Sequence, residues 1–175
     1  MGWFDAVFEV IDMRSFSNLW YWIGLAVVWS TVSHWVLGVP YDMVQRARRR
    51  GGEAERDLQD LVRINVNRLL YIVQLSGVWL LALGSAVLST LAVLGFWYGV
   101  EFAQAVFLLL FPLSLVGLMS IATARRIRAE GDTGEQLYRR LFRHRLLTQV
   151  VGMVSVFVTA MWGMYQNLVV GPFGG

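Results

Sequence analysis

The sequence predicts an all-α, polytopic membrane protein, and three observations favour this fold class. Hydrophobic residues make up 57% of the chain and charged residues only 15%, against roughly 25% charged residues in soluble domains. Four apolar stretches reach the ~20 residues that a helix needs to cross a bilayer, and none contains lysine or arginine. Arginine instead gathers in two connections between them. We therefore expect one domain, residues 18–175, with four transmembrane helices arranged as two hairpins.

The predicted spans cover about residues 18–39, 69–96, 100–122 and 146–170. They lack the alternating pattern of barrel strands, and a backbone in lipid forms its hydrogen bonds within its own segment. Each span is therefore predicted as a helix. Three tryptophans lie deep within the spans, and we expect Trp29, Trp79 and Trp162 to pack between helices.

Residues 1–17 predict a helix of another kind. Their apolar residues recur at spacings of three and four, at Trp3, Phe4, Val7, Phe8 and Ile11. This pattern is typical of an amphipathic helix that lies in the membrane interface. Since the segment has neither the basic start nor the small-residue cleavage site of a secretory signal, we expect it to be retained.

The distribution of arginine predicts the orientation in the membrane. All 15 basic residues are arginine, with seven between Pro40 and Arg68 and seven between Thr123 and Arg145. The connection between the second and third spans has none, and neither has the C-terminal tail. Because positively charged connections stay on the cytoplasmic side, both arginine-rich connections are predicted in the cytoplasm and both termini in the periplasm.

Both cytoplasmic connections are predicted to contain helix. Pro40 should kink or restart the helix after the first span, and Gly51 with Gly52 should end the new one. From Glu53 no breaker precedes the second span, and Leu58, Leu61 and Val62 share one face. A similar extension from Gly134 precedes the fourth span, with apolar Leu137, Leu141 and Phe142. We expect the extensions to form a small cytoplasmic bundle or a platform for a partner.

The chain also resembles itself at an offset of 77 residues. This register places Ala47-Arg48-Arg49 on Ala124-Arg125-Arg126 and Arg68-Leu69-Leu70 on Arg145-Leu146-Leu147 without a gap. Gene duplication would give two hairpins of the same orientation. The alternative is that both connections share a composition because both obey the positive-inside rule.

Small residues form two stripes at helical spacing within the spans. One stripe comprises Ala82, Ser85, Ala86 and Ser89, and the other Ser114, Gly117, Ser120 and Ala124. Such stripes let helices approach closely in lipid, either within one chain or between copies in a homo-oligomer.

Polar groups within or beside the spans are the candidates for a transport pathway, at Ser30, His34, Glu101 and Gln104. His34 follows Ser30 by one turn, and its imidazole suits proton relay or ligand binding; the alternative is an interfacial histidine bonded to backbone or water. Glu101 suits the mouth of a cation path; the alternative is a carboxylate stabilised by the first turn of its helix. The sequence predicts no metal site and no cofactor.

The arginine clusters are the candidates for contact with anionic lipid or with a partner, at Arg48, Arg49, Arg50, Arg125, Arg126, Arg139, Arg140 and Arg143. The alternative is that these arginines only set the orientation of the protein in the membrane and bind neither lipid nor a partner. We expect no binding of nucleic acid, because the sequence contains no recognisable nucleic-acid-binding motif besides the arginines. The chain has no Walker loop, dinucleotide fingerprint, nucleophile elbow or His-Glu-x-x-His helix. We therefore expect a protein that is not an enzyme.

Three blocks carry a resemblance to a known family: residues 11–17 (IDMRSFS), 33–42 (SHWVLGVPYD) and 62–68 (VRINVNR). Over nearly its whole length the chain resembles a family of small alphaproteobacterial four-helix inner-membrane proteins, some labelled "component of SufBCD complex". The resemblance implies a bacterial inner-membrane location and a link to iron–sulfur assembly. Without cysteine the chain has no thiolate for a cluster, so such a link would depend on protein contacts.

Two functions remain open at this stage. The first is a non-enzymatic inner-membrane subunit or assembly factor that docks a larger complex through its arginine-rich cytoplasmic helices. The second is a homo-oligomeric ion channel or transporter lined by the polar residues of the spans. Membrane lipids are the partners expected for either function.

Overall fold

The computed structural model of the protein describes residues 15–170. In chain order the elements are η1 (Ser15–Ser17), α2 (Leu19–His34), β1 (Trp35–Val36), β2 (Val39–Pro40), α3 (Tyr41–Arg50), α4 (Gly52–Ala92), η2 (Val93–Trp97), α5 (Glu101–Glu130) and α6 (Gly134–Val170). The prediction of an all-α fold is confirmed, apart from one pair of two-residue strands. The interfacial helix predicted for residues 1–17 lies outside the described residues, except for the three in η1.

Three of the four predicted spans are helices long and apolar enough to cross a membrane. They are α4 with η2 (Gly52–Trp97), α5, and α6 as far as Val169. Helix α2 has 16 residues and ends at His34, so the expectation that the first helix continues to Val39 is wrong. The arrangement of four spans in two hairpins therefore stays a prediction.

Helix α2 ends because the chain turns back on itself. Strands β1 and β2 are antiparallel, with Trp35 opposite Pro40 and Val36 opposite Val39. The two loop residues between them, Leu37 and Gly38, both have positive φ, 52° and 75°, which is the geometry of a two-residue hairpin turn. Glycine adopts this conformation at no steric cost, whereas leucine rarely does.

Helix α3 begins and ends, and helices α4 and α6 begin, close to where the sequence predicts. Pro40 precedes α3, and Gly51, with φ 60°, ends it. Helix α4 then runs without a break from Gly52, and α6 from Gly134, so both predicted extensions are confirmed. Helix α5 continues past its apolar section to Glu130, where the left-handed Gly131 stops it.

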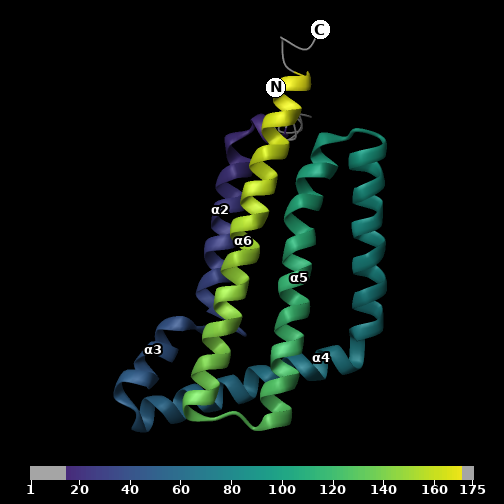
Figure 1. The fold of residues 1–175 in the computed structure, drawn as a ribbon. Helices are drawn as coiled ribbons and strands as arrows, with labels where there is room; N and C mark the ends of the chain where they lie inside the picture. The colour runs from purple at the N-terminus through teal and green to yellow at the C-terminus, as the bar shows by residue number, and fades with distance from the viewer. Residues whose placement is uncertain (1–14, 171–175) are drawn as a thin grey trace, which may run out of the picture.

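Figure 1 shows α2, α5 and α6 side by side, with the first part of α4 lying across their foot. The four buried residues of α4 all lie in that first part, at Leu58, Val62, Val66 and Leu70. Beyond this first part the helix turns and runs in the same direction as α5 (Figure 1). We call residues 71–92 the arm of α4. We call α3, residues 52–70, the end of α5 (123–130) and the start of α6 (134–145) the base.

The main hydrophobic core lies in the base. The buried residues of α4 recur every four positions and so form one face. They pack against Val44 and Ala47 of α3, Ala124 and Ile127 of α5, and Leu137, Tyr138 and Leu141 of α6. Phe142, the third apolar residue named in the extension before the fourth span, is exposed. The extensions thus form a packed bundle of helices.

A second contact holds α2 and η1 against α6, at two glycines. A Cβ at Gly152 would lie 2.8 Å from Cε3 of Trp29, and one at Gly163 would lie 3.2 Å from Cδ1 of Phe16. At Gly152 a larger residue would overlap the Trp29 ring, and at Gly163 a Cβ would press closely on the Phe16 ring. Trp29 is thereby buried beside Leu25 and Val116, as predicted.

The side chains of the arm are more exposed than those of the other helices. Trp79 was expected to pack between helices, but it is 79% exposed, so that prediction is wrong. The small residues Ala82, Ser85, Ala86 and Ser89 are exposed as well. None of the most apolar 18-residue window of the helix is buried inside the protein. The stripe of small residues on the arm therefore has no packing partner among the described residues.

The offset of 77 residues does not align equivalent environments. It pairs the buried Leu58 with the exposed Glu135, and the buried Val62 with the exposed Arg139. A hairpin and a separate helix α3 precede α4, whereas α5 runs unbroken into its arginine-rich end. The internal repeat remains a prediction from sequence.

Candidate functional site

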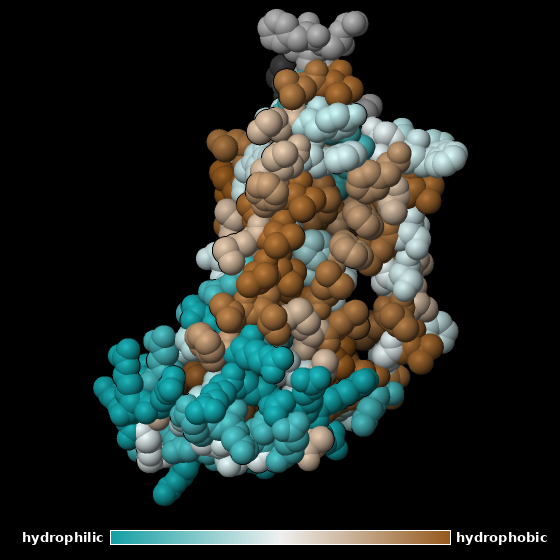
Figure 2. Space-filling view, viewed as in Figure 1, coloured by the Kyte–Doolittle hydropathy of each residue, from teal (hydrophilic) through white to brown (hydrophobic). Residues whose placement is uncertain are grey.

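The two arginine-rich connections meet in the base, where they share one hydrophobic core. Figure 2 shows hydrophilic residues gathered at this end of the molecule and hydrophobic residues over the helices beyond it. The start of α2 and the end of α6 lie at the opposite end. Both arginine-rich connections therefore lie at the same end of the molecule.

Several arginines of the base are neutralised within the chain by exposed carboxylates. Arg48 and Arg139 lie 3.2 and 3.4 Å from the same Glu135 oxygen, and Arg63 lies 3.0 Å from Asp60. Arg46 lies 3.8 Å from Asp42. Exposed pairs of this kind stabilise a protein by ~1 kcal/mol or less, so their main effect is to lower the local positive charge.

One ion pair of the base is buried. The guanidinium of Arg140 contacts both Asp132 and Glu130. The Asp132 side chain is only 1% exposed and that of Arg140 only 22%. Asp132 follows directly on Gly131, which ends α5, and Arg140 lies in the second turn of α6. The pair therefore joins the two helices across the turn between them.

A second group of arginines is exposed and has no carboxylate at ion-pair distance among the described residues. It comprises Arg49, Arg50, Arg56, Arg68, Arg125, Arg126, Arg128 and Arg143. Of the eight arginines predicted to contact lipid or a partner, Arg48, Arg139 and Arg140 are paired within the chain. The other five belong to the unpaired group, so no carboxylate of the described chain offsets their charge: Arg49, Arg50, Arg125, Arg126 and Arg143.

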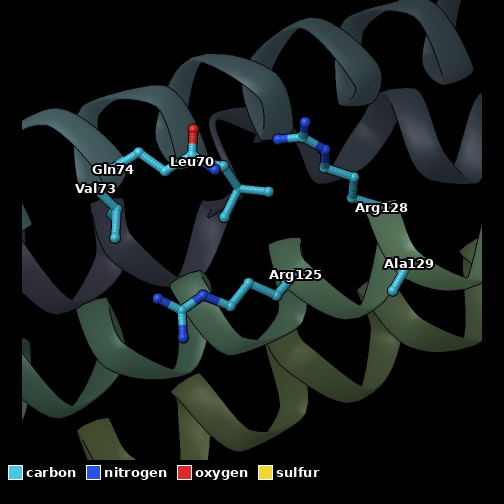
Figure 3. Close-up of a pocket in the computed structure, with 6 residues that line it drawn as sticks. All are labelled: Leu70, Val73, Gln74, Arg125, Arg128 and Ala129. Atoms are coloured by element: carbon cyan, nitrogen blue, oxygen red, sulfur yellow. The ribbon is translucent and has the colours of Figure 1, made fainter.

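Two of the unpaired arginines line a cavity at the bend of α4. We call it the elbow cavity; its volume is about 450 Å³, and it is lined by Leu70, Val73 and Gln74 of α4 and by Arg125, Arg128 and Ala129 of α5. Figure 3 shows Arg128 reaching from α5 toward α4, while Arg125 extends along its own helix. The cavity combines two guanidinium groups with an apolar wall.

Two of the four residues predicted to form a polar pathway lie at the end of the molecule opposite the base. Glu101 accepts a hydrogen bond from the backbone N–H of Phe16 at 2.7 Å. Gln104 is buried; its amide donates to the Gly95 carbonyl at 2.8 Å and accepts from Trp162 at 2.9 Å and from Gln166 at 3.1 Å. From α5, Glu101 therefore binds η1, and Gln104 binds η2 and α6.

The other two predicted pathway residues are exposed on α2. Ser30 lines a shallow pocket between α2 and α6 that also includes Gln149 and Gly152. His34 is the last residue of α2, and its ring meets that of Trp35 edge to face at 6.0 Å. The structure places Glu101 and Gln104 one turn apart at the start of α5, each with its own hydrogen-bond partners, and does not bring Ser30 or His34 to them.

His144, which stands between Arg143 and Arg145 in the sequence, is a buried polar residue. It is 4% exposed, and its Nε2 and Nδ1 lie 3.3 Å from the Ser120 hydroxyl and 3.2 Å from the Thr123 hydroxyl. Because the Ser120 hydroxyl donates to the Val116 carbonyl, it accepts from Nε2–H, and Thr123 donates to Nδ1. Its burial could have been predicted from its spacing from the apolar Leu137 and Leu141, because this spacing places all three residues on one helical face.

Within residues 15–170, no group of three or more histidine, aspartate and glutamate side chains is arranged to hold a metal ion. The candidate site is the base, because the unpaired arginines lie there and the elbow cavity adjoins it. The chain matches no protein-family model, no curated protein and no solved structure.

Proposed function

We propose that the protein is a non-enzymatic subunit or assembly factor of a bacterial inner membrane, and that it docks a larger complex through its base. The observation that carries this proposal is the set of exposed arginines that no carboxylate of the described chain neutralises. Arg49 and Arg50 end α3, and Arg126 lies near the end of α5. These helices share a packed core, so their charges are held at fixed positions. Fixed charges favour recognition of a complementary, acidic protein surface.

The partner we propose is a soluble complex with an acidic face on the cytoplasmic side. The resemblance to proteins labelled as SufBCD components makes the Suf assembly machinery the first complex to test. Because the chain has no cysteine, its role there would be to tether or position the complex rather than to carry a cluster.

Docking is tested by neutralising unpaired arginines and comparing them with paired ones. In the variant Arg49→Gln/Arg50→Gln/Arg126→Gln, we expect a stoichiometric partner to be lost on affinity purification in mild detergent. The control, Arg46→Gln/Arg63→Gln/Arg139→Gln, removes the same charge from arginines that form ion pairs, and it should keep the partner. Equal loss from both variants, or isolation of the wild type alone after crosslinking in native membranes, would overturn the proposal.

The orientation we propose places the base in the cytoplasm and both termini in the periplasm. The chain has no cysteine, so a single introduced cysteine reports its own accessibility without background. Tyr98 is exposed in the turn between η2 and α5, at the end opposite the base. We expect a membrane-impermeant maleimide to label Tyr98→Cys in intact spheroplasts, and to label Arg50→Cys only after the membrane is opened. The reverse pattern would invert the topology.

The alternative function is a homo-oligomeric channel or transporter. It is tested by ion flux in liposomes that contain the wild type or the variants Glu101→Gln and His34→Ala. If the ion flux of the wild type never exceeds that of empty vesicles, the channel or transporter hypothesis is excluded.

A further inference from the structure

The elbow cavity lies where the charged and apolar parts of the protein meet. Its walls are the last buried turn of α4, at Leu70, and the arginine-bearing turn of α5. Beyond Leu70 the arm has no buried residue, and below the cavity lies the charged base. A basic pocket between helices at this level has the position at which membrane proteins bind lipid headgroups.

The charged side of the cavity is suited to a phosphate group. Arg125 and Arg128 are three residues apart and so share one face of α5. Both lack an ion-pair partner among the described residues; the nearby Glu130 is bound by Arg140. Gln74 adds an amide on the facing wall. Guanidinium groups bind phosphate oxygens through paired, charge-assisted hydrogen bonds.

The apolar side of the cavity continues into a surface that no other part of the described chain covers. On the arm, Leu81 and Gly84 continue the helical face of the cavity residues Val73 and Gln74. Leu81 is 65% exposed, and a Cβ built at Gly84 meets no atom within 4 Å. On α5, Gly117 and Ile121 lie on the same helical face as Arg125 and Arg128. A Cβ built at Gly117 meets no atom within 4 Å. Figure 2 also shows an opening between the arm and the rest of the molecule. Acyl chains fit this surface because it is apolar and open.

We propose that the elbow cavity binds one anionic phospholipid, with its phosphate held by Arg125 and Arg128 beside Gln74 and its acyl chains lying between the arm and α5. The lipid fills the space inside the bend of α4 and supplies the packing that the arm lacks. This site goes beyond the docking role and does not depend on it, since the arginines replaced in the docking test, Arg49, Arg50 and Arg126, do not line the cavity.

The test uses the purified full-length chain in mild detergent and native mass spectrometry with phosphatidylglycerol or phosphatidylcholine. We expect the wild type to retain one phosphatidylglycerol and to bind phosphatidylcholine about tenfold more weakly. Arg125→Gln/Arg128→Gln should lower the affinity for phosphatidylglycerol about tenfold and abolish the preference. The control Arg126→Gln/Arg143→Gln removes the same charge outside the cavity and should change neither.

A second variant separates the acyl chains from the headgroup. Gly117→Trp places an indole on the apolar wall without removing charge, and we expect it to weaken retention of phosphatidylglycerol while the protein stays folded. Four outcomes would overturn the proposal: equal losses in the two double variants, no effect of Gly117→Trp, displacement of the lipid by inorganic phosphate alone, or a lipid-free dimer in which a second copy covers the arm.

Discussion

Replacing Arg140 with alanine should destabilise the base more than any other arginine substitution. The Asp132 carboxylate is 1% exposed, so removal of its guanidinium partner leaves a buried charge without compensation. Loss of one partner from a buried ion pair costs ~3–5 kcal/mol in the free energy of unfolding. We expect a loss of this size for Arg140→Ala, measured by denaturant unfolding in mild detergent.

The matched control is the next residue along the helix. Arg139 pairs with Glu135, but its side chain is 80% exposed, and Arg139→Ala should lower the free energy of unfolding by less than about 1 kcal/mol. The double variant Asp132→Asn/Arg140→Ala removes the stranded charge and should recover part of the stability. Equal losses for Arg139→Ala and Arg140→Ala would show that the buried pair does not hold α5 and α6 together.

Replacing Gly152 with valine should separate α2 from α6. A Cβ at this position would lie 2.8 Å from the Trp29 ring, and both partners are part of regular helices, so the overlap is relieved only by moving α2. Overpacking of this kind costs ~1–3 kcal/mol. We expect a lower midpoint of thermal unfolding in detergent and a changed emission of tryptophan fluorescence as Trp29 leaves its buried site.

Gly24 provides the comparison for this effect. It lies on α2, and a Cβ there would meet no atom within 4 Å. Gly24→Val therefore adds the same side chain without overlap, and it should leave the unfolding midpoint nearly unchanged. If both valine variants unfold at the same temperature, helix propensity rather than the contact with Trp29 explains the loss.

The longest helices were predictable because their signals are local. The apolar runs of α4, α5 and α6 exceed the length of a span, and Gly51, with a positive φ of 60°, stops α3 where the sequence predicts. The end of α2 was missed for the opposite reason. Residues 35–39 are as apolar as the helix before them, and the turn depends on Leu37 adopting a positive φ that its side chain disfavours.

The environment of the arm was also beyond sequence reasoning. Hydropathy does not distinguish a side chain that faces lipid from one that faces another helix, because both surroundings are apolar. Trp29 and Trp79 therefore looked alike, yet one lies on Gly152 and the other is exposed. The difference comes from the direction in which α4 leaves the base, which depends on tertiary packing.

For the candidate site, composition predicted where the arginines gather but not which of them remain free. Arg48 meets Glu135 only because α3 packs against α6, and Arg140 meets Asp132 because the turn after α5 brings them together. Arg125 and Arg128 line a cavity because α4 bends beside them. These contacts depend on the fold, whereas Arg139 and Glu135 are neighbours at i,i+4 on one helix.

The short length of α2 has a consequence for the surrounding bilayer. A helix of 16 residues rises about 24 Å, less than the ~30 Å thickness of a hydrocarbon core. If α2 crosses the membrane, the lipid beside it is compressed while the lipid beside α5 and α6 is not. Such one-sided hydrophobic mismatch favours thin bilayers with short acyl chains.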